Sequence, residues 1–161
     1  MTLEAGMRLP DADLLRMGPD GPETVTLSSK LGGRKVVVFA LPGAFTGVCS
    51  TAHLPSFIRT ADAFKEKGVE EIICISVNDP FALHEWGAAT GAHDAGITLL
   101  GDASGDLTRS LKMDFTVPQI GLYGRSNRYA LLVDDGVVSI ASIDEPGVCD
   151  VSTGERLLEK L

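Results

Sequence analysis

One cysteine in this sequence, Cys49, stands where the start of a helix would activate its thiol. An apolar run over residues 36–41 ends at Pro42, and a short loop then leads to Cys49 at the beginning of a helical pattern. The first N–H groups of a helix lack intrahelical partners, and together with the helix dipole they favour a thiolate over a thiol. Isolated cysteines are often inert small hydrophobes, but this placement favours an activated nucleophile. Thr46 adds a hydroxyl nearby.

The elements on either side of Cys49 are expected to fix its position. Residues 36–41 are apolar on both faces, which is typical of a central strand covered on each side. After Cys49, apolar residues recur at helical spacing as far as Phe64, and we expect this helix to end near Gly68. Pro55 removes a backbone donor close to the helix start. The sequence therefore predicts a short first turn that bears Cys49, is hinged to a longer helix and can open.

The rest of the chain alternates strands with helices. Two weak strand signals on either side of a turn rich in glycine and proline predict an N-terminal β-hairpin over residues 13–27. The further strands that we expect lie at 71–77, 97–100, 128–133 and 137–143, with a short connection over 28–33 and a loop over 115–124. We also expect a helix that begins at Pro80 and dissolves from Gly87 onward, a helix within 105–113, and a terminal helix that begins at a capping box of Ser152 and Glu155. This order predicts an α/β protein with a mixed central sheet flanked by helices, as in thioredoxin-like folds.

Length, charge and cysteine content narrow the class of protein. A chain of 161 residues with 44% hydrophobic and 22% charged residues suits one globular domain over residues 1–161. The net charge of −8 argues against a nucleic acid or an anionic membrane as a partner. We find no apolar run long enough to span a bilayer and no secretory signal pattern. Three cysteines at irregular spacings form a poor disulfide framework, so we expect a cytoplasmic protein.

The residues around Cys49 also resemble a known family. Pro42, Thr46 and Cys49 follow the pattern P-x-x-x-T-x-x-C, within the string PGAFTGVCSTAHLPSF, and the string EEIICISVNDPFALHEW follows. The pattern resembles the peroxidatic motif of the peroxiredoxins, and the two strings resemble their type II, peroxiredoxin-five-like subgroup. The resemblance returns at residues 124–136 and implies a thioredoxin-like fold. Gly47 stands where the family usually has a second proline, so we expect a less rigid loop.

This resemblance implies roles for individual side chains. Cys49 would attack a hydroperoxide and become a sulfenic acid, and no metal or organic cofactor would be needed. Thr46 would orient the peroxide and Pro42 would shield the thiolate, although a helix cap and a strand end are their simpler structural roles. Arg128, in the pattern G-R-S-x-R-Y over residues 124–129, matches the active-site arginine of the family and would stabilise the thiolate and the leaving oxygen. Arg125 is a weaker candidate for the same role.

The thiol that reduces the sulfenic acid is left open. Cys74 lies 25 residues after Cys49, the spacing at which plant type II proteins keep a second cysteine, but it also fits a buried strand. Cys149 lies near where animal members keep a resolving cysteine. An external thiol is the third possibility, and the resemblance implies glutaredoxin with glutathione, or thioredoxin, as the reductant. It also implies a homodimer.

Two other functions compete with a peroxidase that acts on hydrogen peroxide and alkyl hydroperoxides. A thiol–disulfide oxidoreductase of thioredoxin type requires a C-x-x-C motif, and Cys49 has no cysteine three residues away on either side. A non-catalytic redox sensor would not require Thr46 and Arg128 beside Cys49. The histidines lack metal-site spacing, so we interpret His53 as a packing or hydrogen-bonding residue and the other two as structural or exposed.

Overall fold

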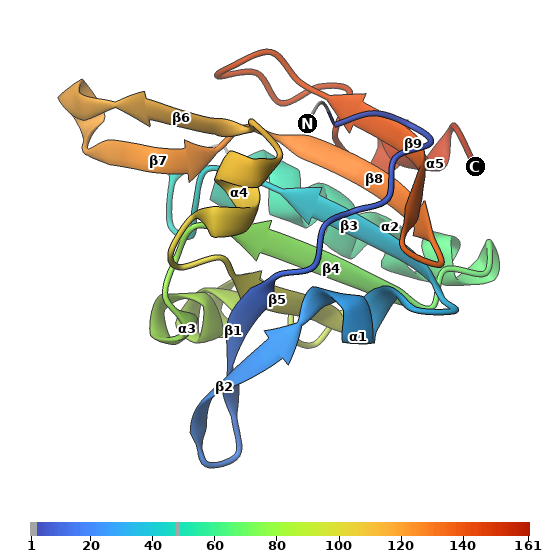
Figure 1. The fold of residues 1–161 in the computed structure, drawn as a ribbon, viewed down its shortest axis with the longest axis horizontal. Helices are drawn as coiled ribbons and strands as arrows, with labels where there is room; N and C mark the ends of the chain where they lie inside the picture. Colours follow the sequence, from blue (N-terminus) through green and yellow to red (C-terminus); the bar gives the residue numbers. More distant parts are fainter. Residues whose placement is uncertain (1–2, 48) are drawn as a thin grey trace.

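The structure is a computed structural model that describes residues 3–47 and 49–161, except for the side chains of Cys49 and Ser50. Its centre is a seven-stranded mixed sheet with the order β2-β1-β5-β4-β3-β8-β9 (Figure 1). The strands of this sheet are β1 (Asp13–Gly18), β2 (Gly21–Thr26), β3 (Lys35–Ala40), β4 (Glu71–Ser76), β5 (Ile97–Gly101), β8 (Tyr129–Asp134) and β9 (Val137–Ile143). Strand β4 runs parallel to β3 and β5, whereas β8 is antiparallel to β3. The mixed sheet and the N-terminal hairpin of β1 and β2 confirm the predicted fold class.

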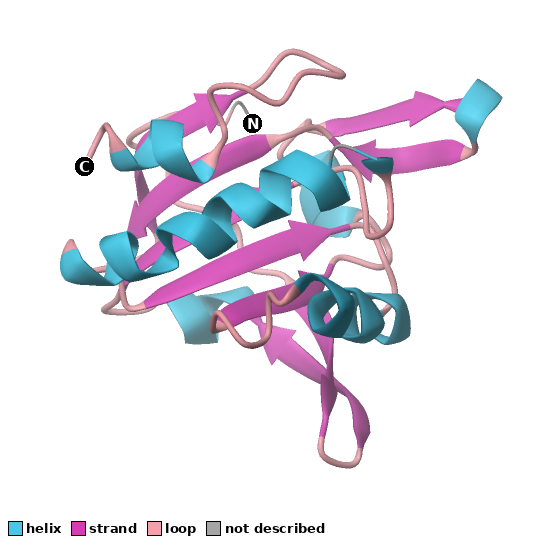
Figure 2. Cartoon of the chain, turned by 180° about the vertical axis from the view of Figure 1, so that it is seen from behind, coloured by secondary structure: helices cyan, strands magenta, loops and turns pink. Residues whose placement is uncertain are grey.

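Helices cover both faces of this sheet. The helical elements are α1 (Leu27–Leu31), a π-helical turn (Cys49–His53), α2 (Leu54–Glu66), α3 (Pro80–Thr90), α4 (Asp106–Ser110) and α5 (Gly154–Leu158). Figure 2 shows the long helix α2 lying across one face. The core on that face joins Val37 and Phe39 of β3 to α2, α3 and α5, and the core on the other face joins Val36 and Val38 to α1 and α4. Alternate residues of β3 therefore point into two cores, which explains why the strand is apolar on both faces.

Two predicted connections contain regular structure instead. Residues 115–124 were expected to form a loop, but β6 (Asp114–Val117) and β7 (Leu122–Ser126) pair there as a separate two-stranded sheet. Figure 1 shows this hairpin extending beyond the edge of the main sheet. The connection after β2 contains the short helix α1, whose Leu27 and Leu31 are buried. Both elements are short and bury few apolar residues, so their periodicity in the sequence is weak.

Two helix boundaries also differ from the prediction. Helix α3 continues through Gly87 to Thr90. A Cβ at Gly87 would meet His93 and Leu99, so the glycine at this position serves close packing and does not end the helix. Helix α5 is capped by Thr153, whose hydroxyl accepts from the amide of Arg156 at 3.3 Å, and not by Ser152 as the capping-box pattern predicts. The pattern is correct about the helix but places its start one residue too early. Within the described residues, every helix is too short or too polar to cross a membrane.

Candidate active site

The π-helical turn Cys49–His53 lies between the loop that follows β3 and helix α2. Helix α2 then begins at Leu54, with Pro55 in its first turn. This arrangement confirms the expected division into a short turn and a longer helix. The division occurs here because Pro55 has no backbone N–H to donate to the preceding turn. A wider π-helical turn is frequently found at functional sites. The side chain of Cys49 itself lies outside what the structure describes.

The loop between β3 and this turn is held by side chains from other elements. The amide of Ala44 donates to Oδ1 of Asn78 at 2.9 Å, and Nη1 of Arg125 donates to the carbonyl of Pro42 at 3.0 Å. The hydroxyl of Thr46 donates to the carbonyl of Gly43 at 2.8 Å, within the loop. Side chains of β7 and of the segment after β4 thus fix the loop that leads to Cys49.

The backbone of this loop has unusual conformations at two nearby residues. Gly43 has a φ of 154°, and a Cβ there would meet the guanidinium of Arg125, so only glycine allows that arginine to reach Pro42. Phe45 has a φ of 62°, which is unusual for a bulky residue, and its side chain is exposed. Such strain persists only where the surroundings fix the conformation, and it is concentrated at functional sites.

A cavity of about 390 Å³ opens beside the loop and gathers three of the residues singled out in the sequence. Pro42, Thr46 and Arg128 all line it. Its other walls include the apolar side chains of Phe115, Val117, Ile120 and Leu122, which come from the unexpected hairpin of β6 and β7 and the turn between them. The lining of the cavity therefore combines apolar side chains of this hairpin with a threonine and an arginine.

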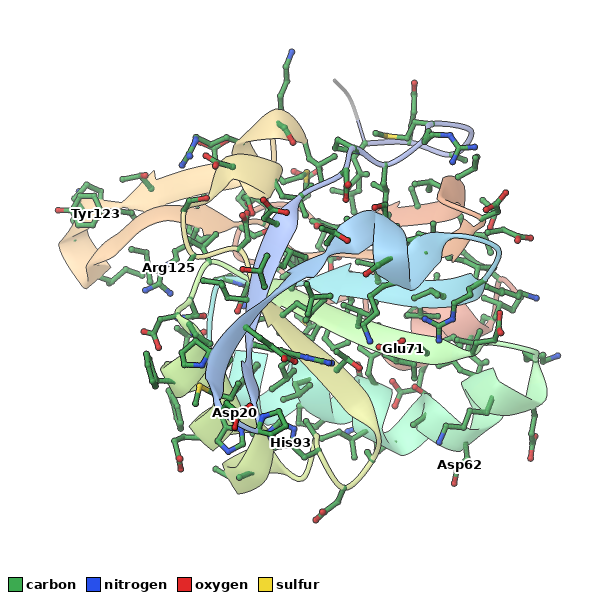
Figure 3. The ribbon with its side chains drawn as sticks, turned by 60° about the horizontal axis from the view of Figure 1, so that its bottom comes forward. Asp20, Asp62, Glu71, His93, Tyr123 and Arg125 are labelled. Carbon is green, nitrogen blue, oxygen red and sulfur yellow. The ribbon has the colours of Figure 1, made fainter. Side chains whose placement is uncertain are left out.

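Arg128 reaches this cavity because of the register of the sheet. Tyr129 pairs with Ala40 in the antiparallel ladder of β8 and β3, so Arg128 lies beyond the end of β3, beside the loop. Its side chain is only 9% exposed, and its Nη1 donates to the carbonyl of Val148 at 3.4 Å. Arg125 is more exposed and points to the loop backbone, which makes it a positioning residue for Pro42. Figure 3 shows Arg125 nearer the body of the protein than Tyr123.

The other two cysteines lie in different environments. Cys74 is 1% exposed, pairs with Phe39 and Leu99 in the centre of the sheet, and belongs to the core beneath α2. Cys149 is half-buried in the segment between β9 and α5. The core position of Cys74 agrees with the structural role that its strand context suggested.

His53 ends the turn that begins at Cys49, and it is fully buried. Its ring contacts Phe39 and Phe57, and its Nε2 lies 3.0 Å from the carbonyl oxygen of Ser152. Burial lowers the pKa of His53 to about 4; the bond to Ser152 opposes this shift, the charge of Arg128 adds to it, and Asp144 opposes it. The ring is therefore neutral at pH 7, and the expectation of a packing and hydrogen-bonding residue is confirmed.

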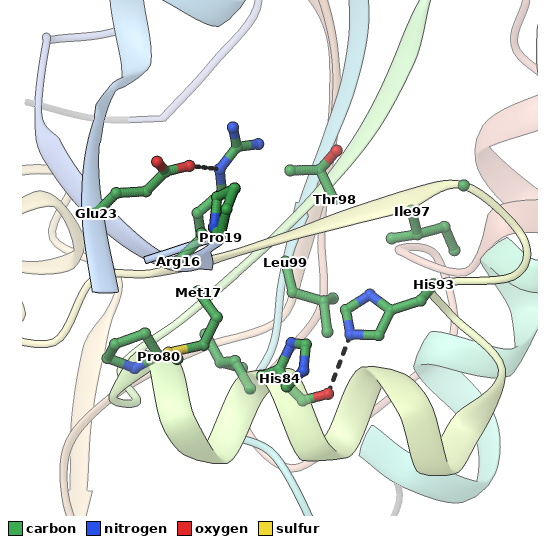
Figure 4. Close-up of a pocket in the computed structure, with 13 residues that line it drawn as sticks. Arg16, Met17, Pro19, Glu23, Pro80, His84, His93, Ile97, Thr98 and Leu99 are labelled. Atoms are coloured by element: carbon green, nitrogen blue, oxygen red, sulfur yellow. Dashed lines mark hydrogen bonds and ion pairs between the residues drawn. The ribbon is translucent and has the colours of Figure 1, made fainter. Parts of the chain in front are cut away.

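A second and larger hollow, of about 570 Å³, lies elsewhere, between the N-terminal hairpin and α3 (Figure 4). His84 and His93 are both exposed there, as expected, and Nε2 of His93 lies 3.0 Å from the carbonyl oxygen of His84. Pro42, Thr46 and Arg128, which line the smaller cavity, do not line this hollow. Across the described part of the chain, no three His, Cys, Asp or Glu side chains come together as a metal site would require.

A thioredoxin-like sheet, with a cysteine in the first helical turn after β3, is typical of thioredoxin-fold proteins that react through a cysteine thiol. The chain belongs to the redoxin family, whose profile matches residues 4–158, and within it to the type II peroxiredoxins, which are thiol-dependent peroxidases. This membership favours the peroxidase over the two competing functions.

Relatives and a solved structure support this assignment. The chain is 46% identical over 164 residues to the chloroplastic peroxiredoxin-2E-2 of Oryza sativa subsp. japonica, covering 99% of this chain and 73% of the relative. It is 41% identical over 142 residues to peroxiredoxin-2B of Arabidopsis thaliana, covering 88% and 87%. The crystal structure of reduced Prx3 from Vibrio vulnificus in complex with hydrogen peroxide has a TM-score of 0.91 and 38% identity and covers 99% of both chains.

Proposed function

We propose that Cys49 is the peroxidatic cysteine of this chain and that Thr46, Arg128 and Pro42 complete its active site within one domain over residues 1–161. The observation that carries the proposal is the convergence of three of these residues on one cavity beside the turn that begins at Cys49. They come from two segments that are 82 or more residues apart, Pro42 and Thr46 from one and Arg128 from the other. A scattered set of structural residues would not be expected to line the same small hollow.

The proposed reaction is a displacement at an oxygen atom. The Cys49 thiolate attacks one oxygen of the O–O bond, the bond breaks, and the other oxygen leaves as hydroxide or alkoxide and takes up a proton. Cys49 becomes a sulfenic acid, so its sulfur loses the two electrons that the peroxide gains. Because the hydroxyl of Thr46 already donates to Gly43, its lone pairs remain to accept from the peroxide O–H. The Arg128 guanidinium stabilises the charge on the leaving oxygen.

The lining of the cavity supports both hydrogen peroxide and alkyl hydroperoxides as substrates. Thr46 and Arg128 belong to this lining, and the O–O bond would react beside them. The apolar wall from β6, β7 and the turn between them offers a surface to an alkyl group. Pro42 closes the cavity on the side of the loop, in line with its proposed shielding role.

The sulfenic acid is then reduced by a thiol, and three sources compete. Cys74 lies in the core beneath α2, Cys149 lies in the segment before α5, and an external thiol is the third source. A disulfide requires Cα atoms within about 7 Å, and we propose that the Cys49 turn opens to bring Cys49 within that distance of its partner. We propose thioredoxin, or glutaredoxin with glutathione, as the final reductant, and the cytoplasm as the compartment.

We propose that the chain acts as a homodimer. Large apolar side chains are exposed in the two segments that contribute to the cavity: Phe45 is 61% exposed, Ile120 69% and Tyr123 64%. Exposed aromatic and aliphatic side chains that lie close to one another are typical of interaction sites, and a second copy of the chain would cover them. Sedimentation velocity at micromolar concentration tests this, and a monomer at all concentrations would contradict it.

Intact-protein mass spectrometry after one equivalent of hydrogen peroxide tests the function. The wild type is compared with Thr46→Val, Cys74→Ser and Cys149→Ser under non-reducing conditions. A gain of one oxygen at Cys49, or a loss of two hydrogens that disappears in one serine variant, supports the peroxidase and identifies the resolving thiol. Thr46→Val should slow the oxidation of Cys49 without abolishing it. A Cys49 that stays unmodified in the wild type would overturn the proposal.

A further inference from the structure

We propose that His53, Ser152 and Asp144 form a latch that holds the Cys49 turn closed against the segment between β9 and α5. This proposal rests on the proposed role of Cys49 and adds positioning residues to it. His53 is the last residue of the turn, while Asp144 and Ser152 lie at the two ends of the segment that contains Cys149. The latch therefore joins the two parts of the chain that hold Cys49 and Cys149.

The first half of the latch is the bond between His53 and Ser152. The carbonyl of Ser152 only accepts, so the nitrogen 3.0 Å away must carry a proton, which fixes the neutral ring as the Nε2–H form. The hydroxyl of Ser152 lies 3.2 Å from the same nitrogen. The other nitrogen, Nδ1, is buried and has no hydrogen-bond partner among the described residues. Only Nε2 therefore attaches the ring of His53 to the C-terminal segment.

The second half of the latch is the carboxylate of Asp144. The Ser152 hydroxyl donates to Oδ2 of Asp144 at 2.5 Å, and the backbone amides of Asp150, Val151 and Ser152 donate to the same carboxylate at 2.9 to 3.2 Å. Asp144 is 6% exposed and Ser152 is fully buried. One carboxylate thus fixes the backbone on which the Ser152 carbonyl and hydroxyl are presented to His53.

The latch must break when the turn opens. His53 lies at the hinge side of the turn, directly before α2, so unwinding of the turn withdraws its ring from Ser152. The groups of the latch are buried, and separating them leaves unsatisfied polar atoms until water enters. The latch therefore adds a cost to opening that a surface hydrogen bond would not.

Opening decides between two fates of the Cys49 sulfenic acid. In the closed turn, a second peroxide transfers an oxygen to the sulfur, its O–O bond breaks, and sulfinic acid and water form. In the open turn, a thiol sulfur attacks, a disulfide forms, and the sulfenic oxygen leaves as water with the proton of the thiol. A tighter latch favours sulfinic acid and a looser latch favours the disulfide.

Hydrogen exchange followed by mass spectrometry measures the opening directly, without any activity. The variants are Ser152→Ala, which removes the linking hydroxyl, and His53→Leu, which removes the donor at similar volume. In both, we expect peptides over residues 49–57 and 144–154 to exchange about tenfold faster, the factor that corresponds to one lost hydrogen bond of about 1.4 kcal/mol. Peptides from β3 and β4 should exchange at the wild-type rate.

Two controls separate the latch from general destabilisation. His53→Gln places an amide N–H near the position of Nε2, so it should restore slow exchange. Ser142→Ala removes another buried serine, whose hydroxyl accepts from Lys160 at 2.8 Å outside the latch, and should leave both peptides unchanged. Unchanged exchange in Ser152→Ala and His53→Leu would overturn the proposal, and so would faster exchange that extends equally to β3 and β4.

The chemical consequence is measured on the same proteins. With hydrogen peroxide and reduced thioredoxin in fixed ratio, the yield of sulfinic acid per disulfide should fall about tenfold in Ser152→Ala and remain near wild type in His53→Gln and Ser142→Ala. An equal yield in all four proteins, with sulfenic acid formed, would overturn the latch but not the peroxidase. Failure to form any sulfenic acid would instead overturn the proposed function, and the exchange data would still decide whether the latch exists.

Discussion

The guanidinium of Arg128 reaches the cavity because β8 begins beside the loop that follows β3 and because Arg128 is only 9% exposed. A buried cation that is fixed before the reaction begins loses little energy in reorganisation, so its effect on developing negative charge is large. We therefore expect Arg128→Gln to slow the reaction of Cys49 with hydrogen peroxide about a hundredfold. Stopped-flow kinetics under pseudo-first-order conditions measure this rate constant.

The same substitution at a surface arginine gives a matched control. Arg109 pairs with Asp106 at 2.6 Å on an exposed part of α4, and surface ion pairs contribute little. Arg109→Gln should react at nearly the wild-type rate. If Arg128→Gln reacted as fast as Arg109→Gln, the proposed role of Arg128 would be wrong.

Three residues of the cavity could be predicted from the sequence, but its apolar wall and the latch could not. Pro42, Thr46 and Arg128 belong to local patterns that can be recognised without knowing what they contact. The bond from His53 to Ser152 spans 99 positions, and no spacing rule connects two such residues. Ser152 also fits a capping box, so its local pattern pointed to a different role. A polar residue that acts through tertiary contacts alone leaves no periodic signal.

At the scale of elements, α5 packs closely against α2, the helix that follows the turn with Cys49. Gly154, the first residue of α5, donates its amide to the hydroxyl of Ser56 at 2.9 Å. A Cβ at this position would meet the carbonyl oxygen of Ser56 at 2.5 Å and the hydroxyl of Thr60. Gly154→Ala must push the helices apart, so we expect it to lower the free energy of unfolding by about 2 kcal/mol.

Urea denaturation of Gly154→Ala and Gly32→Ala tests this prediction. Gly32 has a φ of −58°, and a Cβ there would make only an ordinary contact with the carbonyl oxygen of Ser28 at 3.5 Å. Gly32→Ala should therefore stay within about 0.5 kcal/mol of the wild type. Equal midpoints for the two variants would show that α5 does not dock as closely as the structure indicates.

The elements that the sequence predicted best are those with a strong periodic or local signal. The strand β3 is a continuous apolar run, and Pro55 marks the start of α2 because it lacks a backbone N–H. The hairpin of β6 and β7 was missed because its residues are half-exposed and Pro118 and Gly121 interrupt it. That omission mattered for function, since this hairpin supplies the apolar wall of the cavity.

At the scale of the whole molecule, three distant segments meet at one end of the sheet. Arg125 of β7 binds the carbonyl of Pro42, Arg128 binds the carbonyl of Val148, and His53 binds the carbonyl of Ser152. Each of these contacts links a side chain to the backbone of a segment remote in sequence. The site therefore exists only in the folded chain, and its protonation states are tied to the stability of the whole fold.

This coupling predicts a loss of stability in acid that occurs in two steps. The pKa of His53 is about 4 in the folded protein and 6.5 when unperturbed, so between these values the unfolded chain binds the extra proton. Stability should therefore fall as the pH falls from 6.5 towards 4, by about 2 kcal/mol between pH 7 and pH 5.

The second step belongs to Asp144. Burial alone would raise its pKa, but the hydrogen bonds from the Ser152 hydroxyl and from three amides outweigh it and lower the pKa below 3.8. A lowered carboxylate pKa contributes stability that is present above the ordinary value and is lost as the pH falls through the folded value. The loss due to Asp144 thus begins below pH 4, after the loss due to His53.

Urea denaturation of the wild type and of His53→Gln from pH 7.5 to 4.5 separates the first step from the second. His53→Gln offers an amide N–H to Ser152 but cannot take up a proton. Its free energy of unfolding should therefore change less over this range than that of the wild type does. His84→Gln makes the same change at an exposed histidine and should follow the wild-type curve. If His53→Gln lost as much stability as the wild type between pH 7 and 5, the acid sensitivity would have to come from other groups, and the neutral ring that the latch requires would lose its thermodynamic support.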